Sequence, residues 1–175
     1  NSGVGYFGEE GVLFGGENDT TDIKLADIDG NGALDVVTSN ALRPGFVYFN
    51  NDSSGGFQFQ EAFGSPADTY DVALGDINND GQLDIVSAND GQNTIHQNNA
   101  GVFDETPFGT LAFSYDVTVA DLDGDGTLEI LSGNDGVNEV YDPSSGLTVP
   151  FGAPLTTFRL ATGDLNNDNA LDVVA

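Results

Sequence analysis

The stretch Asp27-Ile28-Asp29-Gly30-Asn31-Gly32-Ala33-Leu34-Asp35 decides the fold, because it recurs three more times along the chain. The other copies occupy residues 76–84, 121–129 and 164–172, so the repeat has a period of 43 to 49 residues. A period of this length is typical of one four-stranded blade of a β-propeller. The sequence therefore predicts a repeat protein.

Two further markers keep register with the acidic stretch. A Phe-Gly pair precedes the first Asp of every copy by 13 residues, at Phe14-Gly15, Phe63-Gly64, Phe108-Gly109 and Phe151-Gly152. An asparagine follows the last acidic residue of the first three copies by five residues, at Asn40, Asn89 and Asn134. Chance does not keep three markers in register over four copies.

Short runs rich in β-branched residues flank each acidic stretch. In the first copy, Ile23-Lys24-Leu25 precedes it, Leu34-Asp35-Val36-Val37 follows it, Phe46-Val47-Tyr48-Phe49 gives a third strand, and a fourth lies near Phe57-Gln58-Phe59. Apolar residues nowhere hold a helical period for three turns. We expect an all-β fold, a β-propeller with blades of four antiparallel strands.

The whole chain, residues 1–175, is expected to form a single β-propeller-type repeat domain of four repeat units. The expected boundaries are a half blade at 1–14, units at 15–63, 64–108 and 109–151, and a half blade at 152–175. The four units are either part of a longer propeller or a ring closed within one chain or between two. An open stack would leave sheet edges exposed, which favours a fragment or a homo-oligomer over a four-bladed monomer.

Each acidic stretch offers side-chain oxygens at positions 1, 3, 5 and 9. These donors are Asp27, Asp29, Asn31 and Asp35; Asp76, Asn78, Asp80 and Asp84; Asp121, Asp123, Asp125 and Glu129; and Asp164, Asn166, Asp168 and Asp172. Position 7 varies, so its backbone carbonyl is the expected ligand, at Ala33, Gln82, Thr127 and Ala170. Hard oxygen donors at alternating spacing suit Ca²⁺, and we expect about four ions, one per loop.

Position 6 is Gly32, Gly81 or Gly126, which allows a sharp turn around an ion, and Asn169 in the fourth copy. A plain Asp-Gly hairpin turn would not need several carboxylates that repel one another. An EF-hand or dockerin loop would need an acidic ligand at position 12, and a helix after it. Position 12 is Thr38, Ser87 or Ser132, so a hairpin loop is expected instead.

The charge of the chain limits its partners. There are 29 acidic residues against three basic ones, Lys24, Arg43 and Arg159, which gives a formal net charge of -26. Such a surface repels nucleic acid and anionic membranes. There is no cysteine, no apolar run of membrane-spanning length, and no signal peptide within this sequence.

Phe-Gly, a short strand and Asp-x-Asp/Asn-x-Asp/Asn-Gly-x-Leu-Asp together resemble the FG-GAP repeat of integrin α-subunit propellers and, more closely, bacterial VCBS-type repeats. The resemblance covers nearly the whole chain. It implies that the calcium loop joins the first and second strands of a blade, and that the first strand lies innermost. The innermost strand is expected to be crowded, and small residues precede each loop, at Ala26, Gly75, Ala120 and Gly163. The phenylalanines of the Phe-Gly pairs are then expected in the core between blades.

We expect no catalytic residue, because the single histidine, His96, falls on a third strand and has no counterpart in the other copies. The expected function is a calcium-stabilised extracellular recognition or adhesion module that binds a glycan or a protein, at the cell surface, secreted or in the periplasm. The alternatives are a calcium-dependent polysaccharide lyase and a structural spacer. Variable loops on a rigid frame favour recognition.

Overall fold

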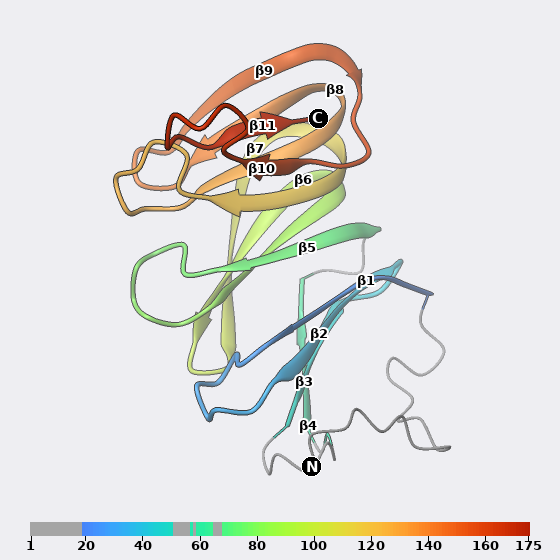
Figure 1. Cartoon of the computed structure of the whole chain (residues 1–175). Helices are drawn as coiled ribbons and strands as arrows, with labels where there is room; N and C mark the ends of the chain where they lie inside the picture. The colour runs from blue at the N-terminus through green and yellow to red at the C-terminus, as the bar shows by residue number, and fades with distance from the viewer. Residues whose placement is uncertain (1–18, 51–56, 58, 65–67) are drawn as a thin grey trace, which may run out of the picture.

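The computed structural model describes residues 19–50, 57, 59–64 and 68–175, which contain β-strands and no helix. In this part of the chain, therefore, no helix could cross a membrane. The strands form antiparallel sheets that stack one above another from the N-terminal to the C-terminal end (Figure 1). The all-β prediction is thus confirmed.

The first sheet contains one complete repeat unit. Its neighbouring strands follow chain order: β1 (Asp19–Ala26), β2 (Asp35–Ala41), β3 (Gly45–Phe49) and β4 (Phe59–Phe63). The predicted fourth strand is therefore displaced toward Phe63, and Phe57 lies outside it. The N-terminal half blade expected at residues 1–14, with Phe14, lies outside the described residues.

The second sheet has five strands, three of them long. They are β5 (Thr69–Gly75), β6 (Asp84–Asn99), β7 (Val102–Ala120), β8 (Glu129–Asp142) and β9 (Leu147–Thr156). The first part of β6 pairs with β5 and its later part pairs with the beginning of β7. The pairing shifts between Gly91 and Asn93, and Gly91 has a positive φ of 115° that lets the chain turn back there.

Each long strand therefore combines two shorter strands of the repeat. In β6 the two arms lie side by side, because the N–H of Asn98 donates to Asp84 Oδ1 at 2.8 Å. The later part of β7 pairs with β8, as β1 pairs with β2. A final pair, β10 (Ala161–Gly163) and β11 (Asp172–Val174), begins another unit. The sheets do not close into a ring within the described residues, so the β-propeller remains a prediction.

The Phe-Gly pairs combine core packing with a change of direction. Phe63 and Phe108 are buried in the two hydrophobic clusters between successive units, and Phe151 is half-buried. A Cβ at Gly45 would overlap the Phe63 ring, so only glycine fits opposite it. Gly64, Gly109 and Gly152, which follow these phenylalanines, have positive φ angles of 75°, 68° and 73°. Glycine adopts that conformation without strain, so the pair ends one unit and redirects the chain into the next.

The marker asparagines lock the turn between the second and third strands. Asn89 accepts a hydrogen bond from Thr69 Oγ1 at 2.9 Å and donates to the carbonyl of Gln92 at 2.8 Å. Asn134 likewise accepts from Ser114 and donates to the Val137 carbonyl. All three asparagines are buried. Buried amides are stable only when they are hydrogen-bonded, which is why this residue type recurs at a fixed distance from the acidic stretch.

Candidate metal-binding loops

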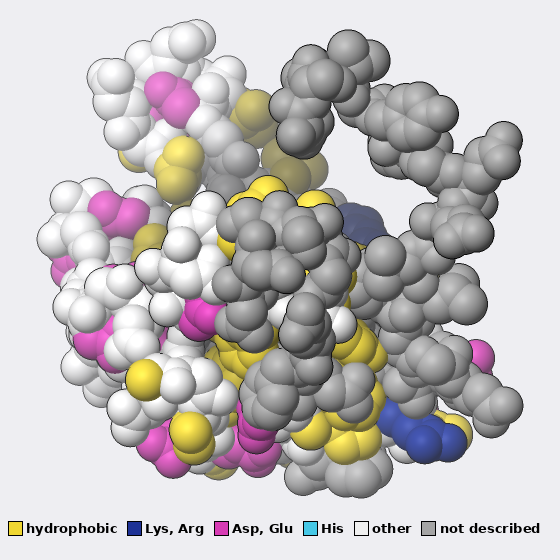
Figure 2. All heavy atoms as spheres, turned by 90° about the horizontal axis from the view of Figure 1, so that it is seen from below, with side chains coloured by type: hydrophobic (Ala, Val, Ile, Leu, Met, Phe, Trp, Pro, Cys, Tyr) yellow, Lys and Arg dark blue, Asp and Glu magenta, His cyan; other side chains and the backbone are white. Residues whose placement is uncertain are grey.

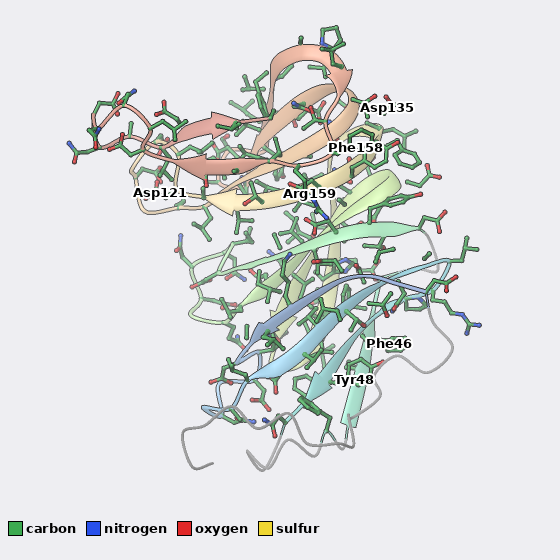
Figure 3. The ribbon with its side chains drawn as sticks, turned by 45° about the vertical axis from the view of Figure 1, so that its right-hand side comes forward. Phe46, Tyr48, Asp121, Asp135, Phe158 and Arg159 are labelled. Carbon is green, nitrogen blue, oxygen red and sulfur yellow. The ribbon has the colours of Figure 1, made fainter. Side chains whose placement is uncertain are left out.

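The four acidic stretches occupy equivalent places in the fold. Each joins the first strand of a unit to the second, as β1 to β2, β5 to β6, β7 to β8 and β10 to β11. The acidic residue at position 9 is the first residue of the second strand each time, at Asp35, Asp84, Glu129 and Asp172. Position 12 lies inside a strand in the first three copies, so these loops are not followed by the helix of an EF-hand. Figure 3 shows Asp121 of the third loop at the opposite end of the sheets from Asp135.

The carboxylate at position 1 organises the loop backbone. Asp27 accepts hydrogen bonds from the N–H groups of Asn31 at 2.9 Å and Gly32 at 2.7 Å. Asp76 receives the same pair of bonds from Asp80 and Gly81, both at 2.9 Å. The loop is therefore wrapped around its first carboxylate.

The carboxylate at position 9 is the buried member of each of the first three loops. The exposed fractions of Asp35, Asp84 and Glu129 are 0%, 0% and 6%. Each accepts the N–H of position 2 in its own loop, at 2.7 to 2.9 Å. Backbone donors hold these oxygens in place without supplying a positive charge that would neutralise them.

Two asparagines that the sequence reading did not single out support this carboxylate. The backbone N–H of Asn50 donates to Asp35 Oδ1 and that of Asn98 donates to Asp84 Oδ1, both at 2.8 Å. Asn98 also donates through its side chain to the carbonyl of Ile28, in the loop of the previous unit, at 2.8 Å. The available signal was an asparagine at the end of the third predicted strand in both units.

Two positions of each loop have left-handed backbone. Position 6 has φ between 68° and 92° at Gly32, Gly81, Gly126 and Asn169. The sequence reading missed position 4, which has φ between 58° and 79° at Gly30, Asn79, Gly124 and Asn167. Only glycine and asparagine occur at these eight places, the residues that adopt this conformation with least strain.

Two of the loops bring three acidic groups together closely enough to hold a metal ion. In the first, oxygens of Asp27, Asp29 and Asp35 lie within 4.8 Å of one another, and in the third those of Asp121, Asp123 and Glu129 do the same. Both clusters use positions 1, 3 and 9. The second and fourth loops have Asn78 and Asn166 at position 3 and therefore one carboxylate fewer there.

The predicted metal ligands at position 5 lie in the same loops, and each already accepts a hydrogen bond from the loop backbone. The side-chain oxygen at position 5 accepts the N–H of position 7 at 2.8 to 2.9 Å, in pairs 31–33, 80–82, 125–127 and 168–170. A carboxylate that accepts one such bond keeps free lone pairs for a cation. The carbonyl ligands at position 7 stay a prediction.

The pKa shifts of two buried carboxyls reflect this crowding. Burial raises the pKa of Asp84, and the negative charges of Asp80 and Asp76 add to the rise against the N–H bonds from Asn98 and Ile77. Burial also raises the pKa of Glu129, together with the charges of Asp123, Asp125 and Asp142. A divalent cation among these oxygens would favour their ionised form. The oxygen ligands, their spacing along the loop and the buried carboxylate at position 9 therefore fit a hard cation.

The single histidine, which a catalytic site could use as its base, lies in the interior of the protein beside Ser87 and Glu105. His96 is 1% exposed, its Nε2 lies 3.0 Å from Ser87 Oγ, and its Nδ1 lies 3.9 Å from Glu105 Oε1. Burial lowers the pKa of His96 to about 4. The 3.9 Å separation is too long for a hydrogen bond that would orient the ring, and Ser87 is itself buried.

The fold and these loops define an all-β repeat protein with acidic hairpin loops. Models of the FG-GAP-like repeat match residues 27–87 and 76–132, and the chain belongs to this family. No curated protein matches the sequence. Among solved structures, the chain is similar to the biofilm matrix protein Bap1 of V. cholerae, with a TM-score of 0.58 and 20% sequence identity. The match covers 90% of this chain but only 28% of that protein.

Proposed function

We propose that the chain is a calcium-stabilised, extracellular recognition or adhesion module that binds a glycan or a protein without catalysing a reaction. The observation that carries the proposal is the fourfold recurrence of one acidic loop in an FG-GAP-like repeat. FG-GAP repeats often bind calcium, and two loops hold three carboxylates within 4.8 Å of one another.

Calcium is the ion that these donors favour. All are hard oxygens, and each loop offers five ligand positions, four side chains and one backbone carbonyl. A second carboxylate oxygen or water would complete the six to eight ligands of Ca²⁺. The ion would neutralise carboxylates that otherwise repel one another. Ion binding would then stabilise the hairpin that joins the first two strands of each unit.

An extracellular role is supported by the structural similarity to Bap1, a matrix protein of a biofilm. The acidic surface supports the same view. Figure 2 shows acidic side chains spread over the described part of one face, with few basic ones among them. Nucleic acid and anionic lipid are poor partners for such a surface.

A glycan array and a protein-capture assay, each run in calcium and in chelator, test the recognition proposal. We expect calcium-dependent retention of at least one glycan or protein. Retention of none in calcium would instead favour a structural spacer. Incubation with uronic-acid polymers, followed by absorbance of the unsaturated product, tests the lyase alternative, and turnover would contradict the non-catalytic proposal.

A further inference from the structure

A second polar cluster lies away from the acidic loops, on the first strands of three successive units and just before the first strand of the fourth. The residue five positions before each acidic loop is Asp22, Asp71, Asp116 or Arg159. Lys24 lies beside them on β1, so two of the three basic residues of the chain gather here. Figure 3 shows Arg159 between the uppermost strands and β5.

Two of these aspartates join consecutive units. Asp71 Oδ2 accepts the N–H of Val117 at 3.1 Å, and Asp116 Oδ2 accepts the N–H of Leu160 at 2.8 Å. The other oxygen of Asp116 accepts a hydrogen bond from Arg159 Nη1 at 2.7 Å. Asp116 is therefore fully engaged within the protein.

Asp71, in contrast, has an oxygen that is not fully engaged. The residue is only 2% exposed, and its Oδ1 atom is buried without a hydrogen bond. Lys24 Nζ and Arg159 Nη1 each lie 3.6 Å from this oxygen, beyond hydrogen-bonding distance. Burial raises the pKa of Asp71 to about 6, and the charges of Asp22 and Asp116 add to that rise against the Val117 N–H and Lys24. A buried carboxylate oxygen without a donor is a costly arrangement that a bound donor would relieve.

Asp71 lines an open groove of about 570 Å³ between β1, β5, the later part of β7 and residues 159–160. This volume falls in the range of about 300–1,000 Å³ that is usual for small-molecule sites. Leu25, Leu74, Val119 and Leu160 supply apolar walls beside the charged groups. A ligand reaches the Asp71 oxygen only if Lys24 and Arg159 move aside. Their side chains are 38% and 71% exposed, and each would loosen a 2.7 Å contact, with Asp22 and Asp116 respectively.

The charges select the chemistry of the ligand. An anion in the groove would meet Asp71 and Asp116 on a protein of net charge -26. A cation would meet Lys24 and Arg159 beside Asp71 Oδ1. A sugar hydroxyl both donates and accepts, so it can satisfy a carboxylate and a neighbouring cation together, and the ring's C–H faces can pack on leucine and valine.

We propose that this groove binds a neutral sugar, with hydroxyl groups that donate to Asp71 and accept from Lys24 and Arg159. The inference rests on the proposed recognition function and assigns it a site and a ligand class. The first strands of three units build the site, so it depends on the stacking of the units.

The test is a titration of the ¹⁵N-labelled, calcium-loaded chain with methyl glucoside, methyl galactoside and methyl mannoside. The backbone amides of Val117 and Leu160 report on the groove, since they bond to Asp71 and Asp116. We expect at least one neutral sugar to shift both amides saturably, and glucosamine and glucuronate to bind at least about tenfold more weakly.

Asp71→Asn and Lys24→Gln are each expected to weaken that binding at least about tenfold. Lys24→Gln leaves the Asp71–Val117 bond in place, so it keeps the test valid if Asp71→Asn does not fold. Arg43→Gln is the control, because it removes the third basic residue, which is exposed and lies outside the groove.

Unshifted Val117 and Leu160 amides with all three methyl glycosides would overturn the groove assignment. So would a Kd for the bound sugar that Lys24→Gln changes no more than Arg43→Gln does. The recognition proposal would survive either result if the array or the capture assay still finds a calcium-dependent partner, so the two failures are distinguishable.

Discussion

At the level of single residues, burial distinguishes the carboxylate at position 9 of a candidate metal-binding loop from the other side-chain oxygens of the loop. Asp35 and Asp84 are fully buried, while Asp29, Asn31 and Asp80 lie on the surface. The buried carboxylate is fixed by backbone N–H groups before any ion arrives. For a bound ion the loop would therefore offer one rigid ligand and several adjustable ones, which would lower the ordering cost of binding.

Glu129→Gln tests this division of roles in the third loop. The amide oxygen of glutamine can still accept the Leu122 N–H, which now donates to Glu129 Oε2 at 2.7 Å, but the charge is lost. We expect the calcium affinity of this loop to fall at least about tenfold, equivalent to about 1.4 kcal/mol. Because burial raises the pKa of Glu129, the calcium-free protein should not lose stability at pH 7. Calorimetric titration and thermal unfolding in chelator measure the two quantities, and a calcium affinity equal to the parent's would contradict the role.

His96 gives a pH dependence with a definite sign. Its pKa is about 4 in the folded protein and about 6.5 in an unfolded chain, so the unfolded state takes up the proton first as the pH falls. The contribution of the neutral ring to stability is therefore complete above pH 6.5 and declines between pH 6.5 and 4. Denaturant unfolding of the parent and of His96→Gln across this range should show the difference between them shrinking toward pH 4. A constant difference would show that His96 does not titrate as inferred.

The comparison must be between variants, because Asp71 makes the opposite contribution. Its pKa is raised to about 6, so its stabilisation is complete below about pH 4 and is lost as the pH rises through 6.

How far the sequence predicts the site follows from how local each interaction is. The donors and the turn glycines lie within nine residues, so their spacing alone identifies them. Asn50 and Asn98 reach the loops from the end of the third strand, after a turn whose length varies, and a fixed spacing cannot reveal them. The groove at Asp71 needs the first strands of several units side by side, which only the stacked structure supplies.

At the level of strands, predictions succeeded where periodicity was local. The first, second and third strands of the units occur where β-branched runs predict them. The fusion of strands into β6, β7 and β8 was not predicted. It arises because Gly91 in β6, Gly109 in β7 and Gly136 in β8, all at positive φ, bend the chain without ending its pairing. Sequence marks such glycines but does not show whether a strand stops or only bends there.

The glycine just before an acidic loop is tightly packed in the second unit, at Gly75, and has free space beside it in the fourth unit, at Gly163. A Cβ at Gly75 would lie 2.8 Å from Leu128 Cδ1 and 3.0 Å from Val119 Cγ2, whereas at the equivalent Gly163 no described atom lies within 4 Å. We expect Gly75→Ala to destabilise the protein by about 1–3 kcal/mol through overpacking against the next unit. Gly163→Ala should change stability by no more than about 0.5 kcal/mol. Urea unfolding of the two variants measures both, and equal effects would contradict the packing argument.

Over the whole molecule, the repulsion caused by the net charge of -26 can be reduced in two ways, by salt screening and by specific ion binding in the loops. An experiment must distinguish these two effects. Sodium chloride screens charges more than about 10 Å apart at 0.1 M, but it does little for carboxylates within 4.8 Å of one another. A chelator should therefore lower the unfolding temperature even in 0.5 M sodium chloride. Millimolar calcium should restore it, and magnesium should restore less, because Mg²⁺ demands a stricter geometry and keeps its waters.

Thermal unfolding at fixed ionic strength measures these differences, with Asp27→Asn and Asp121→Asn together as the loop-disabled variant. That variant should lose most of the calcium response of the first and third loops while keeping its response to sodium chloride. If chelator, calcium and the double variant leave the unfolding temperature unchanged in high salt, then charge repulsion alone explains the acidic loops and specific calcium binding is wrong. If the response survives in the double variant, the second and fourth loops carry the stabilising ions, even though each has one carboxylate fewer at position 3.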